Sequence, residues 1–270
     1  MSTYDAAGSG RSLARTMLNK VPEVTLFFWI IKILCTTVGE TAADYLNDNL
    51  GFGLTNTTYI AGALLAVLLL VQFRLRRYVA AAYWAVVVVI SVFGTLITDN
   101  MSDHYNVPLT TSTPIFAAIL AVVFAVWYAV ERTLSIHSIV TTRREAFYWL
   151  AILFTFALGT AAGDLVAEKA DLGYAVSILI FGGAIALVAI AHYGLKMNAI
   201  LAFWLAYILT RPLGASIGDF LTQNSKKYGG LGLGTTTVSY IFVGLILALV
   251  AYLSITKIAR TKPDAMTVEA

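Results

Sequence analysis

One motif occurs four times in this chain, and its regular spacing constrains the fold more than any other feature. Each copy has a tryptophan, a glycine ten residues later and an aspartate five residues after that. The copies are Trp29–Gly39–Asp44, Trp84–Gly94–Asp99, Trp149–Gly159–Asp164 and Trp204–Gly214–Asp219. Because the aspartates keep a fixed distance from a glycine inside apolar segments, we interpret them as parts of one shared polar site.

The motifs lie in a chain whose composition is typical of a membrane protein. Of its 270 residues, 59% are hydrophobic and 12% are charged, whereas soluble domains carry about 25% charged residues. The net charge of +3 gives no reason to expect a nucleic-acid partner. With one cysteine and three histidines, a zinc or copper site is not expected, and we predict no tightly bound cofactor.

Eight apolar segments have about the length that a helix needs to cross a bilayer. They lie at residues 24–46, 57–73, 79–101, 113–131, 145–166, 174–193, 197–221 and 236–256. Their apolar runs are continuous and do not alternate with polar residues, as the strands of a membrane barrel would. The predicted fold class is therefore an all-α integral membrane protein with eight transmembrane helices.

The basic residues indicate the orientation of these helices. With the N-terminus inside, thirteen lysines and arginines fall on the inner side and three on the outer side, while Lys32 and Arg211 lie within spans. This asymmetry follows the positive-inside rule. We therefore predict a multi-pass protein of the cell inner (plasma) membrane with both termini cytoplasmic.

Each motif is followed by one plainer apolar segment, so a repeat has two spans. An even number of spans makes all four motifs cross in the same direction, as parallel repeats with the motif helices inside. The spacing between aspartates is 55, 65 and 55 residues, which places the extra length between the second and third repeats. The predicted organisation is a cytoplasmic arm (1–21), a first half (22–131), a cytoplasmic linker (132–144), a second half (145–256) and a cytoplasmic tail (257–270).

The helical positions around each glycine indicate different roles along the motif. Fifteen residues of helix place the aspartate roughly 22 Å from its tryptophan, so we expect the tryptophans near the inner interface, as packing or anchoring residues. The four glycines are expected at close helix–helix contacts. The residue after the glycine is Glu40, Thr95, Thr160 or Ala215, and it lies one turn below the aspartate on nearly the same face.

Four carboxylates at one depth would repel each other unless something neutralises them. Protons, bound cations or the counter-charges Lys32 and Arg211 can do so. Carboxylates with hydroxyls and no thiol suit a hard cation such as Mg²⁺ or Mn²⁺, with the four aspartates as metal ligands. In the alternative interpretation, the aspartates are separately solvated at helix ends and Lys32 extends to the inner surface.

These features resemble a family of bacterial membrane proteins of unknown function, built from four tandem repeats of two transmembrane regions with a characteristic tryptophan. The resemblance rests on the four tryptophans, the following Gly-x4-Asp and the segment Gly39-Glu-Thr-Ala-Ala-Asp44. It implies the architecture and a bacterial membrane location. Thr160 and Ala215 stand where the first repeat has Glu40, so the acidic layer below the aspartates is not fourfold.

The leading functional hypothesis is transport of a small cation, in its narrower form the export of a divalent metal coupled to protons. Asp44, Asp99, Asp164 and Asp219 would bind the cation or protons, with Glu40, Thr95 and Thr160 below them. The rival hypothesis is a scaffold or sensor that transports nothing and is held together by the acidic helix faces. An enzyme is not expected, because no catalytic triad and no phosphate-binding loop is present. Expected partners are membrane lipid and a small cation or protons, and a homo-oligomer is left open.

Overall fold

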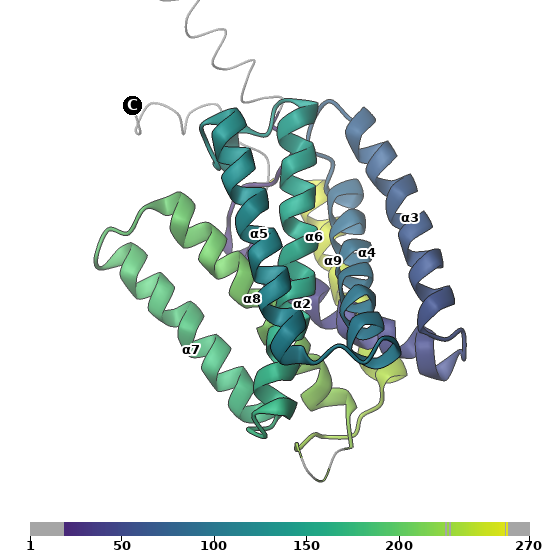
Figure 1. Ribbon diagram of the computed structural model, residues 1–270. Helices are drawn as coiled ribbons and strands as arrows, with labels where there is room; N and C mark the ends of the chain where they lie inside the picture. Colours follow the sequence, from purple (N-terminus) through teal and green to yellow (C-terminus); the bar gives the residue numbers. More distant parts are fainter. Residues whose placement is uncertain (1–18, 225, 227, 257, 259–270) are drawn as a thin grey trace, which may run out of the picture.

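The protein is described here by a computed structural model that covers residues 19–224, 226, 228–256 and 258. Apart from residue 258, the expected C-terminal tail lies outside these residues, as do all but the last residues of the N-terminal arm. Within them the chain forms eight long helices and no strand (Figure 1). The helices are α2 (Leu26–Asp44), α3 (Leu54–Arg74), α4 (Ala80–Asp99), α5 (Leu109–Glu131), α6 (Thr142–Asp164), α7 (Tyr174–Tyr193), α8 (Ala199–Thr222) and α9 (Thr235–Thr256).

All eight helices are long and apolar enough to cross a membrane. The predicted all-helical fold with eight such segments is confirmed, and the observed bounds differ from the expected ones by a few residues at each end. Residues 19–21, which we assigned to the N-terminal arm, are buried against the helices.

The four motif helices form an inner ring. Contacts run from α2 to α4, from α4 to α6, from α6 to α8 and from α8 back to α2. Between 56% and 61% of the apolar window of each inner helix is buried inside the molecule, against 17–22% for α3, α5, α7 and α9. The four inner helices are buried to a similar extent, so the polar groups of their motifs meet other protein groups. The outer helices, which are mostly exposed, carry no such motif.

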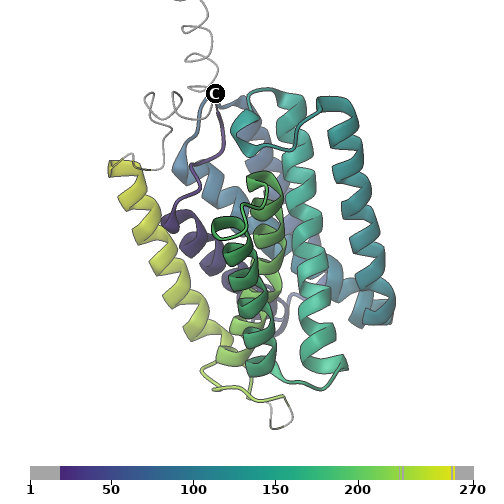
Figure 2. The ribbon, with the colours of Figure 1, turned by 90° about the vertical axis from the view of Figure 1, so that its left-hand side faces the viewer.

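Each outer helix packs on the inner helix of the following repeat. Thus α3 lies on α4, α5 on α6 and α7 on α8, and α9 closes the circle by packing on α2 (Figures 1 and 2). The outer helix of the last repeat therefore packs on the inner helix of the first repeat, and this contact joins the two ends of the helical region.

The motif glycines set the register of the ring. A Cβ atom on Gly39 would lie 1.9 Å from Ser91 Oγ, and one on Gly94 would lie 2.6 Å from Phe156 Cβ. Gly159 meets Arg211 and Gly214 meets Thr36 in the same way. In every case the neighbour is the residue three positions before the next glycine around the ring. Only glycine allows this approach, so the helices are closest at the four motif glycines.

The ends of the inner helices are also defined by local chemistry. Thr25, Thr141 and Asn198 accept backbone N–H hydrogen bonds at the starts of α2, α6 and α8. After the motif aspartate, three inner helices continue into five-residue π-helical turns, Tyr45–Asn49, Asn100–His104 and Leu165–Lys169. Helix α8 lacks this turn and continues as an α-helix through Pro212 to Thr222. The fourth repeat therefore ends differently from the other three.

Candidate functional site

Arg211 lies at the centre of the inner ring and contacts all three other inner helices. Its Nη2 donates a hydrogen bond to Glu40 Oε2 at 2.9 Å and one to Thr160 Oγ1 at 2.7 Å, and it also contacts Thr95 Oγ1. Nη1 donates to the Thr36 carbonyl at 2.5 Å. The structure therefore brings together four residues that the sequence analysis selected from four different repeats, namely Glu40, Thr95, Thr160 and Arg211.

The Arg211–Glu40 ion pair is buried. Arg211 is fully enclosed and Glu40 is 6% exposed. Two charges removed from water need each other and further hydrogen bonds to offset the loss of solvation, and the two threonine hydroxyls and the Thr36 carbonyl supply these bonds. The Arg211 stem passes directly over Gly159, where a Cβ would lie 2.3 Å from Arg211 Cγ. Glycine at that position is thus what admits the arginine into the ring.

The four motif aspartates lie beyond this ion pair, toward the far end of the ring. Asp219 is buried, whereas Asp44, Asp99 and Asp164 are partly exposed. Asp99, Asp164 and Asp219 each interact electrostatically with Glu40 and with Asp44. The five acids therefore share one electrostatic field, in which Glu40 forms an ion pair with Arg211.

Sharing a field does not make these carboxylates a metal centre. Among the described residues, no group of three or more histidine, cysteine, aspartate or glutamate side chains is close enough together to hold a metal ion. In this conformation the four aspartates do not converge on one point. The predicted set of metal ligands, Asp44, Asp99, Asp164 and Asp219, would have to move to form such a site.

Lys32 lies apart from the acids, on the opposite side of Arg211. It is fully buried, and its Nζ is 4.2 Å from the centroid of the Tyr207 ring and 4.3 Å from that of Phe156. No hydrogen-bond acceptor and no carboxylate pairs with this amine among the described residues. The idea that Lys32 extends to the inner surface is wrong, because aromatic rings enclose its end. The Tyr207 and Phe156 side chains provide cation–π contacts to Lys32 in place of an ion pair.

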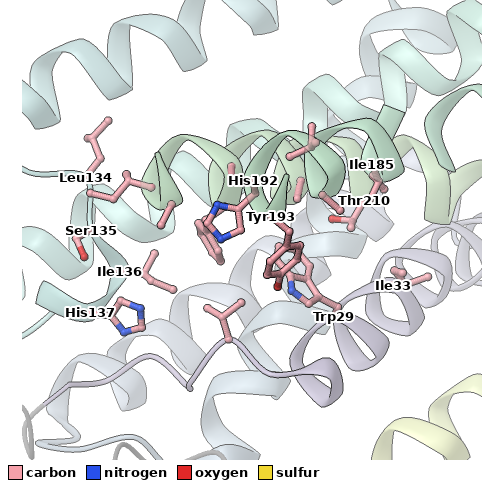
Figure 3. A pocket seen from close by; sticks show the side chains of 18 residues that line it. Trp29, Ile33, Leu134, Ser135, Ile136, His137, Ile185, His192, Tyr193 and Thr210 are labelled. Atoms are coloured by element: carbon pink, nitrogen blue, oxygen red, sulfur yellow. The ribbon is translucent and has the colours of Figure 1, made fainter. Parts of the chain in front are cut away.

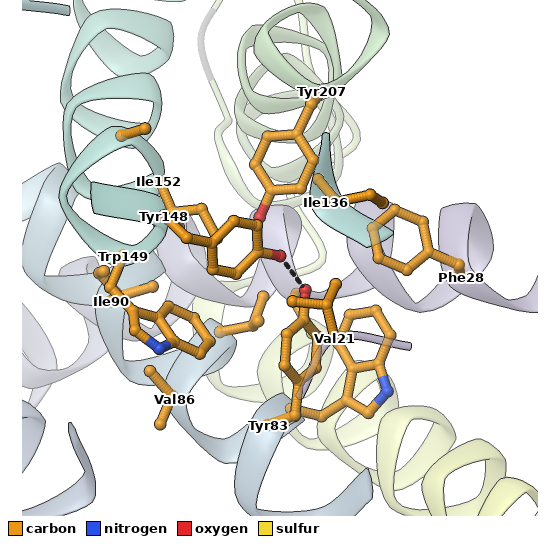
Figure 4. Packing of buried hydrophobic residues seen from close by; sticks show 14 of the residues in the cluster. Val21, Phe28, Tyr83, Val86, Ile90, Ile136, Tyr148, Trp149, Ile152 and Tyr207 are labelled. Carbon is orange, nitrogen blue, oxygen red and sulfur yellow. Dashed lines mark hydrogen bonds between the residues drawn. The ribbon is translucent and has the colours of Figure 1, made fainter. Parts of the chain in front are cut away.

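Aromatic side chains fill the ring below Lys32. Phe28 packs on Trp84, Tyr83 on Trp149, Tyr148 on Trp204 and Phe203 on Trp29, so each contact joins neighbouring repeats. The hydroxyls of Tyr83 and Tyr148 form a hydrogen bond of 2.5 Å across the ring (Figure 4). Trp84, Trp149 and Trp204 are buried, and Trp29 is half-buried. The rings of these three face the core of the protein, which favours the packing role over an anchoring belt.

Several residues of this arrangement were missed in the sequence. Phe156 contacts both Lys32 and the Arg211 guanidinium, at 5.5 Å from its centroid to Cζ. Phe156 stands three residues before its motif glycine, the same position as Arg211 in the fourth repeat. Comparing this position between repeats would have drawn attention to it. Lys20 was missed because its partner, Glu145 at 2.6 Å, is 125 residues away.

The four repeats of this ring can now be compared with known proteins. A family model described as a repeat of unknown function, DUF347, matches residues 27–78, 82–133, 147–198 and 202–259. The chain belongs to this family. No curated protein and no solved structure matches it.

Each DUF347 match spans one inner helix and the outer helix that follows it. This confirms the predicted four tandem two-helix repeats. The DUF347 repeats differ at the positions that carry charge. Three residues before the glycine stand Thr36, Ser91, Phe156 and Arg211, and seven before it stand Lys32, Val87, Ile152 and Tyr207. A nearly fourfold frame therefore holds an asymmetric centre, with a single arginine and a single lysine near its axis.

Proposed function

We propose that the protein transports a small cation across the membrane through the inner ring, with protons as the coupling or competing species. The observation that carries the proposal is the buried Arg211–Glu40 ion pair, one turn of helix from the motif aspartate Asp44. A cation or proton that reaches Glu40 competes directly with Arg211 for its carboxylate. Binding and release of the transported ion would thus be tied to the position of one tethered positive charge.

The charge balance of the motif segments favours a cation over an anion. From each tryptophan to its aspartate, the four motifs together carry five acids, the four aspartates and Glu40, and two bases, Lys32 and Arg211. Carboxylates at membrane depth are costly unless they are paired or protonated. A bound cation or several protons would offset the excess negative charge. The narrower proposal, export of a divalent metal, requires the aspartates to draw together around the ion.

Arg211 has other contacts that would hold it when a cation or a proton binds Glu40. Its Nη1 already contacts the Thr36 carbonyl, and its guanidinium lies beside the Phe156 ring. In the tryptophan-containing part of the ring, Lys32 and the Tyr83–Tyr148 contact close the axis in this conformation. We infer that a second conformation opens the tryptophan-containing part of the ring while the aspartate-containing part closes. We also infer that the repeats insert in parallel into the cell inner membrane, with both termini in the cytoplasm.

A flux measurement in proteoliposomes tests the proposal. Mn²⁺, Mg²⁺ and proton movements would be followed with the wild-type protein and with Asp99→Asn. The matched control is Asp103→Asn, because Asp103 is an exposed acid just beyond the same helix and lies outside the motif. The proposal expects transport by the wild type and the control, and loss of transport in Asp99→Asn. Equal fluxes in all three proteins and in empty vesicles would contradict it.

A scaffold or sensor without transport remains the second candidate, and the closed circle of repeats is the observation that favours it. In that case the ion pair would hold the helices together and do nothing else. Glu40→Gln would then lower stability in detergent, while no cation would move in the wild type. The same vesicles therefore separate the two candidates.

A further inference from the structure

A cavity of about 580 Å³ lies outside the inner ring, between α2, α7, α8 and residues 134–137. Its volume is within the range of known small-molecule sites. Most of its lining is apolar, with contributions from Ile33, Ile185 and Phe203 (Figure 3). The lining residue Tyr193 is exposed at the surface of the bundle. Its lining contains neither the motif aspartates nor the Arg211–Glu40 pair.

The cavity lies beside the outer helix of the third repeat, at a position where the four outer helices differ. The nineteenth residue of the four outer helices is Gln72, Trp127, His192 and Leu253 in chain order. Gln72, Trp127 and Leu253 are all buried, and Trp127 packs edge-on against Trp204 at 5.7 Å. His192 is half-buried and lines the cavity. The third repeat therefore has an opening at a position that the other repeats fill.

The wall of the cavity is held in place by the ring. Trp204 Nε1 donates a hydrogen bond of 2.9 Å to the Leu134 carbonyl, which fixes the 134–137 segment against α8. Ile136 on this segment is buried in the core. A cavity with walls fixed in this way exists before a ligand arrives, and this lowers the entropic cost of binding.

The two ends of the cavity differ in chemistry. Figure 3 shows Ser135 and His137 toward one end, His192 nearer the middle, and Ile33, Ile185 and Thr210 toward the other end. From Tyr193 to Ile185, eight helical residues give the apolar part a length of roughly 12 Å. His192 Nδ1 is 3.0 Å from the Met197 carbonyl, which can only accept, so Nδ1 carries the hydrogen and Nε2 is left for a ligand.

We propose that this cavity binds one anionic phospholipid of the surrounding bilayer, with an acyl chain along the apolar part and the phosphate at His137 and His192. The contact requires a second proton, on Nε2, because only the imidazolium then donates a charge-assisted hydrogen bond to a phosphate oxygen. Pockets between transmembrane helices that contain basic groups are suited to lipid headgroups, and the two histidines are the basic groups in the lining of this one. Glu131, just before this segment, is already paired with Arg143 and Arg144, so it does not oppose an anion there.

Trp29 provides a probe inside the cavity, because it lines the wall and is half-buried. The full chain would be placed in vesicles of phosphatidylglycerol or phosphatidylcholine with brominated acyl chains, which quench tryptophan fluorescence on contact. The signal of Trp29 is the difference between the wild type and Trp29→Phe. We expect this signal to be quenched in both lipids, and at a several-fold lower proportion of brominated phosphatidylglycerol.

Two kinds of variant separate the acyl chain from the headgroup. Ala206→Phe fills the cavity and should protect Trp29 from quenching, whereas Ala186→Phe, on the exposed face of α7 outside the cavity, should not. His137→Gln combined with His192→Gln should keep quenching but reduce the preference for phosphatidylglycerol by about fivefold, the effect of losing a charge-assisted contact near water. His104→Gln at the other end of the molecule is the control.

The proposal fails if Ala206→Phe and Ala186→Phe leave Trp29 equally quenched, or if the wild type shows no preference between the two lipids. Melting of each variant in detergent shows whether it is folded. Should Ala206→Phe not fold, Val188→Phe replaces it, because Val188 lines the same cavity. None of these outcomes depends on whether the protein transports a cation.

Discussion

The aspartate-containing half and the tryptophan-containing half of the inner ring are made by the same four helices but are filled in opposite ways. One half holds the four motif aspartates, three of them partly exposed, above the Arg211–Glu40 ion pair. The other is packed with aromatic rings that leave Lys32 without an acceptor among the described residues. The difference shows that a repeated backbone frame can combine a charged region with one packed with aromatic rings. The Arg211–Glu40 ion pair lies at the junction between them.

The largest effect should come from breaking the ion pair at this junction. Glu40→Gln leaves Arg211 as a buried charge without its counterion, and removal of one partner from such a pair costs about 3–5 kcal/mol. Equilibrium unfolding in mixed detergent micelles measures this loss. Asp103→Asn serves as the control and should change the free energy of unfolding very little, because Asp103 is exposed. A small effect of Glu40→Gln would mean that the two halves do not differ in the way described.

The ring glycines should come next, since both halves depend on them for close packing. Gly159→Ala places a methyl group against the Arg211 stem and Pro212, and such overpacking costs about 1–3 kcal/mol. Gly183→Ala on α7 is the matched control, because no described atom lies within 4 Å of a Cβ there. The control should be neutral or stabilising, and equal melting temperatures for the two variants would refute the proposed register.

Removing the charge from the tryptophan-containing half should have the opposite sign. Lys32→Met keeps a side chain of similar length and removes an amine that lacks a hydrogen-bond acceptor among the described residues. Burial of an unsatisfied polar group costs about 1–3 kcal/mol, from which the two ring contacts of Lys32 must be subtracted. We therefore expect a rise in melting temperature together with slower transport. A clear loss of stability would show that Lys32 has a partner which this conformation does not contain.

The smallest effect should come from the hydroxyl pair in the aromatic layer. Tyr83→Phe removes its hydrogen bond to Tyr148 and keeps the ring packing, so we expect a cost of about 1 kcal/mol. The double variant with Tyr148→Phe should be no less stable than the single variant, because no hydroxyl is then left without its partner. An additive loss would indicate that each hydroxyl has its own separate role.

The sequence contained enough information to predict the repeats, the eight helices and the inner position of the motif helices, because hydrophobic periods and fixed spacings are local. It could not show that α9 packs on α2 or that Lys20 pairs with Glu145, since both contacts join distant parts of the chain. A helical wheel for α8 compares Arg211 only with residues of its own helix, such as Asp219. The partner proved to be Glu40 on α2. The equivalent positions of the tryptophans suggested that they lie at the membrane interface. Three of them are instead buried in the core, where neighbouring aromatic residues pack on them.

The central claim is that a cation or proton competes with Arg211 for Glu40, and a double-mutant cycle tests it most directly. The free energy of unfolding would be measured for the wild type, Glu40→Gln, Arg211→Met and the double variant, each with and without Mn²⁺ or Mg²⁺ and at neutral and acidic pH. We predict a coupling of about 2–3 kcal/mol between the two residues at neutral pH without the metal, which falls when the cation is added or the pH is lowered. A coupling that stays the same under all these conditions would contradict the account.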